Sequence, residues 1–99
     1  MVQKINILGY EFSGPYSIDG DFNKVAGIYI ITSDSNAQHK IDIGETENLG
    51  ERIPNHERRN CWTRHNGVYL WFHFENDETS RLKKEKELRD HFDPICGEI

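Results

Sequence analysis

At 99 residues, the chain is long enough to bury one modest hydrophobic core but not two. A charged fraction of 29% beside 35% hydrophobic residues favours a folded domain with a polar surface over a disordered chain. The formal net charge of −5 excludes a broadly basic protein that coats nucleic acid through many lysine and arginine contacts.

Strand patterns dominate the first half of the chain. Residues 5–12 predict one strand, and the SGPYSIDGDFN stretch after it predicts turns, so we interpret residues 1–26 as an N-terminal extension. GIYIIT at 27–32 is rich in β-branched and aromatic residues and predicts a second strand. Residues 39–44 predict a third, near enough to pair with 27–32 as an antiparallel hairpin.

The second half of the chain alternates between helix and strand. Thr46 is the expected N-cap of a helix that follows at once. VYLWFHF at 68–74 has the strongest strand pattern of the chain and predicts a central strand. Residues 77–92 predict a helix capped by Asp77 or Thr79. Together these elements predict a small α/β domain of the α+β kind.

The cysteines and the lack of apolar runs bear on the compartment. Cys61 and Cys96 are far apart in sequence and form no CxxC pair, so we interpret both as reduced thiols. The histidines lack the spacing of a zinc site. No apolar run approaches the ~20 residues of a membrane span, and the first residues lack the apolar block of a signal peptide. The sequence therefore predicts a cytoplasmic protein without membrane contact.

A tyrosine and a carboxylate are predicted to be neighbours on the hairpin. Because side chains alternate along a strand, Tyr29 faces away from the isoleucines on either side of it, and Asp42 does the same. If the isoleucines point into the core, Tyr29 and Asp42 lie together on an outer face.

A carboxylate also lies on the packing face of the predicted last helix. The apolar arc of that helix consists of Leu82, Leu88 and Phe92. Glu85 falls near the centre of this arc, where burying its charge requires a partner or a metal ion. Arg81 and Arg89 project near the same arc, so an ion pair with one of them is an equal alternative.

Four short motifs follow one another along the chain. They are GIY at 27–29, IG at 43–44, T-x-N-L-x-x-R-x-x-x-H from Thr46 to His56, and E-x-x-L-x₅-P from Glu85 to Pro94. In this order and spacing they resemble the motifs of the GIY-YIG endonuclease superfamily. The resemblance implies a GIY-YIG-like domain over residues 27–97, in which helices flank a small three-stranded antiparallel sheet.

The resemblance also implies a chemistry, the hydrolysis of nucleic-acid phosphodiester bonds, DNA above all, with one Mg²⁺ or Mn²⁺ ion. Tyr29 would activate or position the attacking water, and His56 would assist. Arg52 would hold the scissile phosphate near Gly44, and Glu85 would bind the metal. A guanidinium and a hard cation suit the negative charge of this transition state. A protein partner that supplies DNA affinity is a further expectation.

Asp42 departs from the family pattern, because it stands where relatives have the tyrosine of the second signature. A carboxylate beside Tyr29 would raise the pKa of the phenol. Pro54 also interrupts the helix that should carry Arg52. Three interpretations stay open: Asp42 is a second metal ligand with Glu85, the chain is an impaired module that binds nucleic acid or protein without cutting, or it is a structural or regulatory domain.

Overall fold

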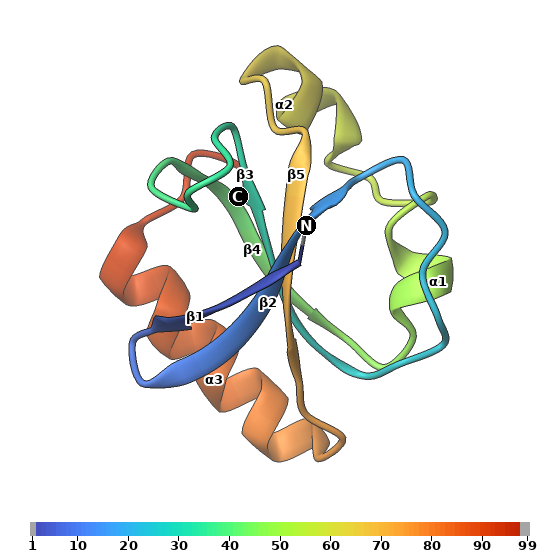
Figure 1. The fold of residues 1–99 in the computed structure, drawn as a ribbon. Helices are drawn as coiled ribbons and strands as arrows, with labels where there is room; N and C mark the ends of the chain where they lie inside the picture. Colours follow the sequence, from blue (N-terminus) through green and yellow to red (C-terminus); the bar gives the residue numbers. More distant parts are fainter. Residues whose placement is uncertain (1, 98–99) are drawn as a thin grey trace.

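The computed structural model describes residues 2–97, which form one five-stranded antiparallel sheet with three helices around it (Figure 1). The strands are β1 (Gln3–Ile7), β2 (Tyr10–Ser17), β3 (Gly27–Thr32), β4 (Lys40–Thr46) and β5 (Tyr69–Phe74), in the spatial order β1-β2-β5-β3-β4. The helices are α1 (Leu49–Arg52), α2 (Arg59–Arg64) and α3 (Glu78–Phe92). The α+β class is thus as predicted.

The N-terminal segment adds two strands to the sheet, so the predicted three-stranded sheet is too small. The single strand expected over residues 5–12 is broken by a tight turn at Leu8 and Gly9, whose φ angles of 55° and 89° suit a two-residue hairpin. Of the stretch interpreted as turns, residues 13–17 instead continue β2, whereas the turns predicted after them are present at residues 18–20. Since β2 pairs with β1 on one side and β5 on the other, the expected extension belongs to the same sheet as the rest of the chain.

The pairing of β3, β4 and β5 confirms the predicted hairpin and the central strand. β3 and β4 are antiparallel, with Tyr29 opposite Gly44 and Ile31 opposite Asp42. β5 pairs with the other side of β3 and takes the middle position of the sheet. This register puts Tyr29 and Asp42 on the same face, as the alternation predicts.

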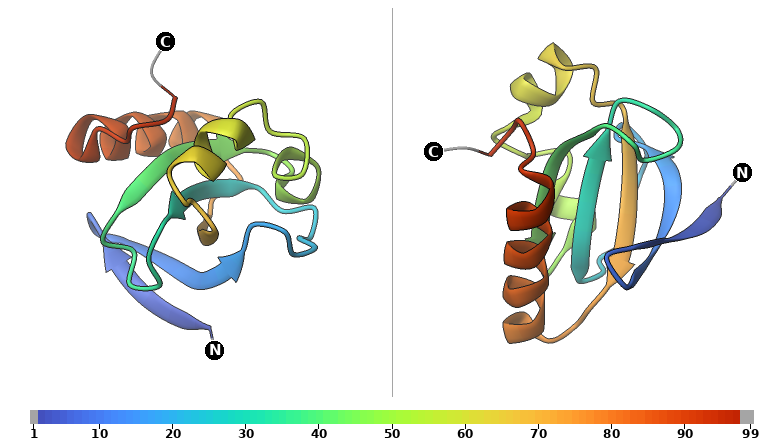
Figure 2. Two further views of the ribbon diagram at one scale, coloured as in Figure 1. Left: turned by 90° about the horizontal axis from the view of Figure 1, so that it is seen from above. Right: turned by 90° about the vertical axis from the view of Figure 1, so that its left-hand side faces the viewer.

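That face is buried, however, so the expectation of an outer face is wrong. Helix α3 packs on one side of the sheet, and α1 and α2 lie on the other (Figures 1 and 2). Leu49, Ile53 and Trp62, from α1, its C-terminal end and α2, cover Tyr29 and the strands beside it. As a result Tyr29 and Asp42 are only 1% and 0% exposed.

The two short helices differ from the single helix expected after β4. Asn48, not Thr46, is the N-cap of α1, because its side chain accepts a backbone N–H of the first turn. The helix ends at Arg52, just before Pro54, which confirms the predicted interruption. Helix α2 was not predicted. Asp77, one of the two expected caps, begins α3.

Helix α3 buries charge as well as apolar surface. Leu82, expected in its packing arc, is 51% exposed, whereas Leu88 is fully buried. Arg81 is buried too, and its Nε donates to Glu45 on β4 at 2.9 Å, which compensates the loss of water. Within residues 2–97, no helix is both long enough and apolar enough to cross a membrane.

Cys61 and Cys96 form a disulfide, so their interpretation as reduced thiols is wrong. The two cysteines are separated by 35 positions in the sequence but are close in space, with their Cα atoms 6.0 Å apart. The Cys96 N–H donates to the Ile41 carbonyl, which holds the segment after α3 against β4. The disulfide then joins that segment to α2.

Candidate active site

Three of the predicted side chains meet on the face of the sheet that α1 and α2 cover. The Tyr29 hydroxyl lies 2.6 Å from Nε2 of His56, and the two rings meet edge to face. The Arg52 guanidinium is close enough to act on the pKa of Tyr29. Arg52 also forms a salt bridge of 2.8 Å with Glu57, which lowers the pKa of that carboxyl to about 2. Arg52 is the most accessible member of this group, with 35% of its side chain exposed.

Gly44 makes room for the tyrosine. The Tyr29 side chain extends from β3 over Gly44 on β4. A Cβ at position 44 would therefore overlap the hydroxyl end of the Tyr29 ring. A glycine after Ile43 is therefore what lets Tyr29 reach His56. Its expected contact with substrate stays a prediction.

The hydrogen bonds of His56 fix its protonation. Its Nδ1 accepts the backbone N–H of Arg58 at 3.0 Å, so a neutral ring carries its proton on Nε2 and donates it to Tyr29. Burial lowers the pKa of His56 to about 4, and the charges of Arg52 and Arg58 add to the effect. Burial, and then the charge of Asp42, raise the pKa of Tyr29. At neutral pH the pair is thus a phenol beside a neutral imidazole, and the hydroxyl hydrogen is directed elsewhere.

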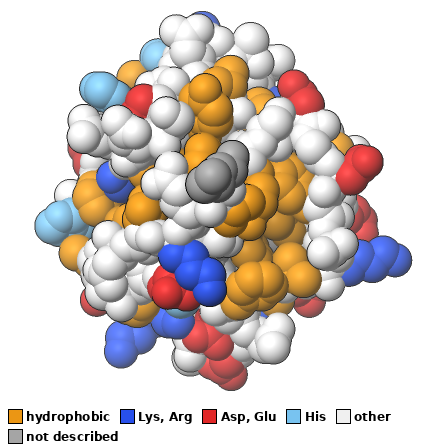
Figure 3. Space-filling view, viewed as in Figure 1, with side chains coloured by type: hydrophobic (Ala, Val, Ile, Leu, Met, Phe, Trp, Pro, Cys, Tyr) orange, Lys and Arg blue, Asp and Glu red, His pale blue; other side chains and the backbone are white. Residues whose placement is uncertain are grey.

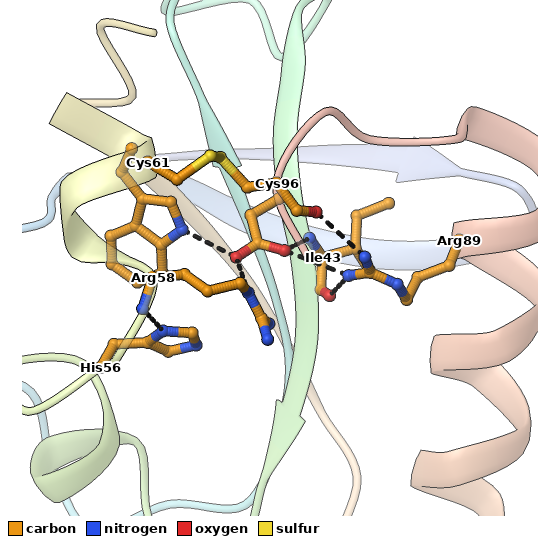
Figure 4. The surroundings of a disulfide bond; sticks show 8 residues. Ile43, His56, Arg58, Cys61, Arg89 and Cys96 are labelled. Atoms are coloured by element: carbon orange, nitrogen blue, oxygen red, sulfur yellow. Dashed lines mark hydrogen bonds and ion pairs between the residues drawn. A yellow bond between two sulfur atoms is a disulfide. The ribbon is translucent and has the colours of Figure 1, made fainter. Parts of the chain in front are cut away.

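Both oxygens of Asp42 are engaged by N–H donors. Oδ2 accepts from Nε of Arg58 and from the indole of Trp62, each at 2.7 Å. Oδ1 accepts from the guanidinium of Arg89 at 3.1 Å and from the backbone N–H of Ile43 at 2.8 Å. Figure 4 shows this network beside the disulfide. Asp42 thereby links β4 to α2, to the segment before it and to α3.

Glu85 approaches the other side of β4 from α3. Burial raises the pKa of this half-buried carboxyl, and the neighbouring charge of Glu45 raises it further. Arg81 and Arg89, the alternative partners considered for Glu85, form no salt bridge with it. Arg81 pairs with Glu45, and Arg89 pairs with Asp42. The charges of Arg89 and Arg58 act in the opposite direction and lower the pKa of Glu85.

A polar hollow connects Arg52 with α3 at the end of β4, the edge strand of the sheet. It has a volume of about 350 Å³ and is lined by Glu45, Thr46, Glu47, Arg52, Glu78 and Arg81. Arg52 also lines a second polar hollow, of about 290 Å³, with Asn48 and Asn55. The accessible guanidinium of Arg52 is thus open to a ligand that lies along this edge.

A separate apolar hollow lies on the same sheet face, farther toward β2. Its volume is about 270 Å³, and its apolar lining includes Tyr16, Phe22, Phe72 and Phe74. Hydrophobic side chains gather in this part of the surface in Figure 3. None of the residues predicted for the active site lines it.

Two residues of the site, Arg58 and Trp62, received no role from the sequence. Arg58 belongs to the charged run ERRN directly after His56. Trp62 is fully buried, and its indole N–H donates to Asp42. The useful signal was Asp42 itself, because a carboxylate inside a strand needs basic or N–H partners.

The described part of the chain contains no group of three or more histidine, cysteine, aspartate or glutamate side chains that could hold a metal ion. Comparisons with known proteins gave no matching family model, curated protein or solved structure. The resemblance to GIY-YIG endonucleases thus depends on the four motifs alone.

Proposed function

We propose that this chain is a metal-dependent endonuclease that hydrolyses phosphodiester bonds in nucleic acid, with DNA as the first substrate to test. One observation carries the proposal: Tyr29, His56 and Arg52, which two motifs of the sequence single out, converge at the edge strand β4. Glu85 approaches the same strand from α3, and the charge of Arg58 acts on the pKa of both Tyr29 and Glu85.

Each side chain has a role that its surroundings support. Arg52 binds the scissile phosphate, because its guanidinium lines the hollows at the end of β4 and carries a full charge. The phosphate competes there with Glu57, which is exposed and free to move aside. Tyr29 acts as a phenol that orients the attacking water through its own hydrogen, while His56 holds the hydroxyl oxygen from the other side.

Of the two carboxylates expected to bind Mg²⁺ or Mn²⁺, only Glu85 fits. The oxygens of Asp42 already accept four N–H groups, so we assign that residue a positioning role instead. Glu85 forms no salt bridge within residues 2–97, and a hard cation can be held by one carboxylate together with water and phosphate oxygens. A bound ion would supply positive charge to the phosphate oxygens.

The disulfide supports a different compartment from the cytoplasm that the sequence predicts. Disulfides persist in oxidising environments and are rare in the reducing cytosol. The Cys61–Cys96 bond therefore favours an oxidising compartment as the site of action, in place of the cytoplasm. A separate partner that adds to the DNA affinity of the chain remains part of the proposal, because the net charge of −5 makes binding by the chain alone weak but measurable at low salt.

A cleavage assay with matched variants tests the function. The purified protein is incubated with branched, nicked and linear DNA and with Mg²⁺ or Mn²⁺, beside Arg52→Ala and Glu85→Gln. We expect both substitutions to reduce cleavage by about 100-fold or more. Arg64→Ala and Asp90→Asn, which change exposed residues of α2 and α3, are expected to leave cleavage unchanged. Cleavage that survives both site substitutions would come from a contaminant and would reject the proposal.

The burial of the tyrosine and histidine favours a second candidate, a module that binds nucleic acid or protein without cutting. Tyr29 and His56 are only 1% and 5% exposed, and Arg52 is already paired with Glu57. A site that is satisfied in this way is stable without substrate. Salt-sensitive binding of DNA by a protein that never cleaves it, under any of the metal conditions, would favour this candidate.

A further inference from the structure

Arg58 occupies a position between the two halves of the proposed site. Its backbone N–H donates to His56, and its side-chain Nε donates to Asp42 at 2.7 Å. Within residues 2–97, Nε is the only side-chain nitrogen of Arg58 that forms a hydrogen bond, and the two terminal nitrogens of the guanidinium form none. Figure 4 shows them pointing away from the carboxylate, and 28% of the side chain is exposed.

Arg58 shares its carboxylate partner with a second guanidinium group. Two guanidinium groups, of Arg58 and Arg89, share the single negative charge of Asp42. Trp62 adds a neutral N–H donor to the same carboxylate. Asp42 can therefore neutralise at most one of the two guanidinium groups, at a place where the charge of Arg58 acts on the pKa of both Tyr29 and Glu85.

We propose that Arg58 is a second phosphate-binding side chain of this site and that Asp42 is the positioning residue that holds it. The inference rests on the proposed function, because the ligand is the backbone phosphate of the same nucleic acid. With Nε fixed by Asp42, the outer edge of the guanidinium presents its terminal N–H groups to a phosphate oxygen without further loss of side-chain freedom. Asp42 stands where the GIY-YIG motif has its second tyrosine, and in this proposal it serves phosphate binding indirectly, by holding Arg58 in position.

The salt dependence of DNA binding separates a phosphate contact from a purely structural ion pair. Each phosphate contact that is lost reduces the slope of log K against log salt concentration by about 0.9. A short duplex with a fluorescent label is titrated with the intact chain in EDTA at several salt concentrations. For Arg58→Gln we expect a slope smaller by about 1 and a weaker affinity at low salt. For Arg58→Lys, which keeps the charge, we expect the wild-type slope with a weaker affinity.

Matched controls keep the result interpretable. Arg64→Ala removes an exposed positive charge from the neighbouring helix, and its slope is expected to stay that of the wild type. Near-ultraviolet circular dichroism reports whether each variant is folded. If Arg58→Gln does not fold, the comparison of Arg58→Lys with the wild type decides the question, and equal affinities would overturn the proposal.

The outcomes also separate this inference from the proposed function. Cleavage that requires Arg52, together with an unchanged salt slope in folded Arg58→Gln, would overturn the role of Arg58 and leave the endonuclease intact. A wild-type chain that neither binds nor cuts DNA would overturn both. A reduced slope in Arg58→Gln, with the slope of Arg58→Lys preserved, supports the second phosphate contact.

Discussion

Asp42 links strand β4 to helices α2 and α3 through a single carboxylate. The sequence identifies it as an anomaly, a carboxylate in an apolar strand opposite Ile31. Its side-chain partners come from two distant parts of the chain, the segment 58–62 and helix α3, so local periodicity cannot identify them. A buried carboxylate needs several donors at once, and here those donors bring the surrounding elements together.

Loss of the charge of Asp42 is predicted to destabilise the whole protein. In Asp42→Asn, the guanidinium groups of Arg58 and Arg89 lose their carboxylate, and the cost of breaking such a buried pair is about 3–5 kcal/mol. Chemical denaturation measures this change in the free energy of unfolding. Asp90→Asn removes an exposed partner of Lys86 and should change stability by no more than about 0.5 kcal/mol. Equal stabilities of the two variants would contradict the role of Asp42.

His56 is predicted to make the stability depend on pH. Its pKa falls from 6.5 in the unfolded chain to about 4 in the folded protein, so the unfolded chain binds the proton more tightly. The stability is therefore complete above pH 6.5 and decreases as the pH falls toward 4, by roughly 3 kcal/mol over the full range. Denaturation at a series of pH values measures the slope. His56→Gln should flatten it between pH 6.5 and 5, and an unchanged slope would show that another group is responsible.

The candidate site could be predicted from the sequence in part, and the reason lies in its local motifs. Tyr29, Arg52 and His56 stand at fixed spacings in continuous segments, and the structure brings them together. Arg58 and Trp62 escaped because their importance comes from a single contact across the fold, with a residue on another element. The catalytic roles themselves stay predictions.

At the scale of elements, strongly patterned segments were predicted well and polar ones poorly. β3, β5 and α3 combine β-branched runs or a clear cap with sufficient length, and the structure has them within two residues of the expected bounds. The β1–β2 hairpin was taken for a single strand, because a turn through Leu8 and Gly9 lacks the Asn-Gly signal of such loops. Helix α2 has no side-chain N-cap, so the sequence lacks the local signal from which its start could be predicted.

The packing of β3 against β4 is predicted to fail when Gly44 gains a methyl group. In Gly44→Ala the new Cβ would overlap the Tyr29 ring, which has no room to retreat in a buried face. We expect a loss of about 1–3 kcal/mol in the free energy of unfolding, typical of an overpacked core. Thermal denaturation measures the effect. Gly20→Ala, at an exposed turn with a looser neighbourhood, serves as the control, and comparable melting temperatures would argue against the close fit.

At the scale of the whole molecule, two hydrophobic clusters on opposite faces of one sheet stabilise the fold. The cluster under α1 and α2 includes Tyr29 and Trp62, and the cluster under α3 includes Phe12, Trp71 and Leu88. Because Phe12 comes from β2, the second cluster depends on the N-terminal segment. The sequence offered no sign of this, since a boundary after residue 26 was drawn from turn residues alone.

A fragment comprising residues 27–97 is predicted not to fold cooperatively. This fragment lacks β1 and β2, so β5 would become an edge strand and Trp71 would be exposed to water. We expect a broad, shallow thermal transition in circular dichroism, whereas the complete chain should unfold in one step. A sharp transition in the fragment would instead support an independent domain with that boundary.

Reduction of the disulfide is predicted to weaken the complete chain substantially. The bond closes a loop over a separation of 35 residues, for which the chain-entropy model gives about 3–4 kcal/mol. Denaturation with and without a reductant measures the difference. The double variant Cys61→Ser and Cys96→Ser should be as stable as the reduced protein, and its stability should not change when the reductant is added. If reduction leaves stability unchanged, the fold does not depend on this bond.

The central position of β5 has a consequence for how the protein is made. The first hairpin leaves the ribosome early, but the strand that joins it to the rest of the sheet is synthesised only after β3, β4 and both short helices. Until then the apolar side of β2, with Phe12, has no partner to cover it. Such distant pairing slows folding and leaves a nascent chain open to aggregation, so β5 is the segment whose arrival completes the sheet.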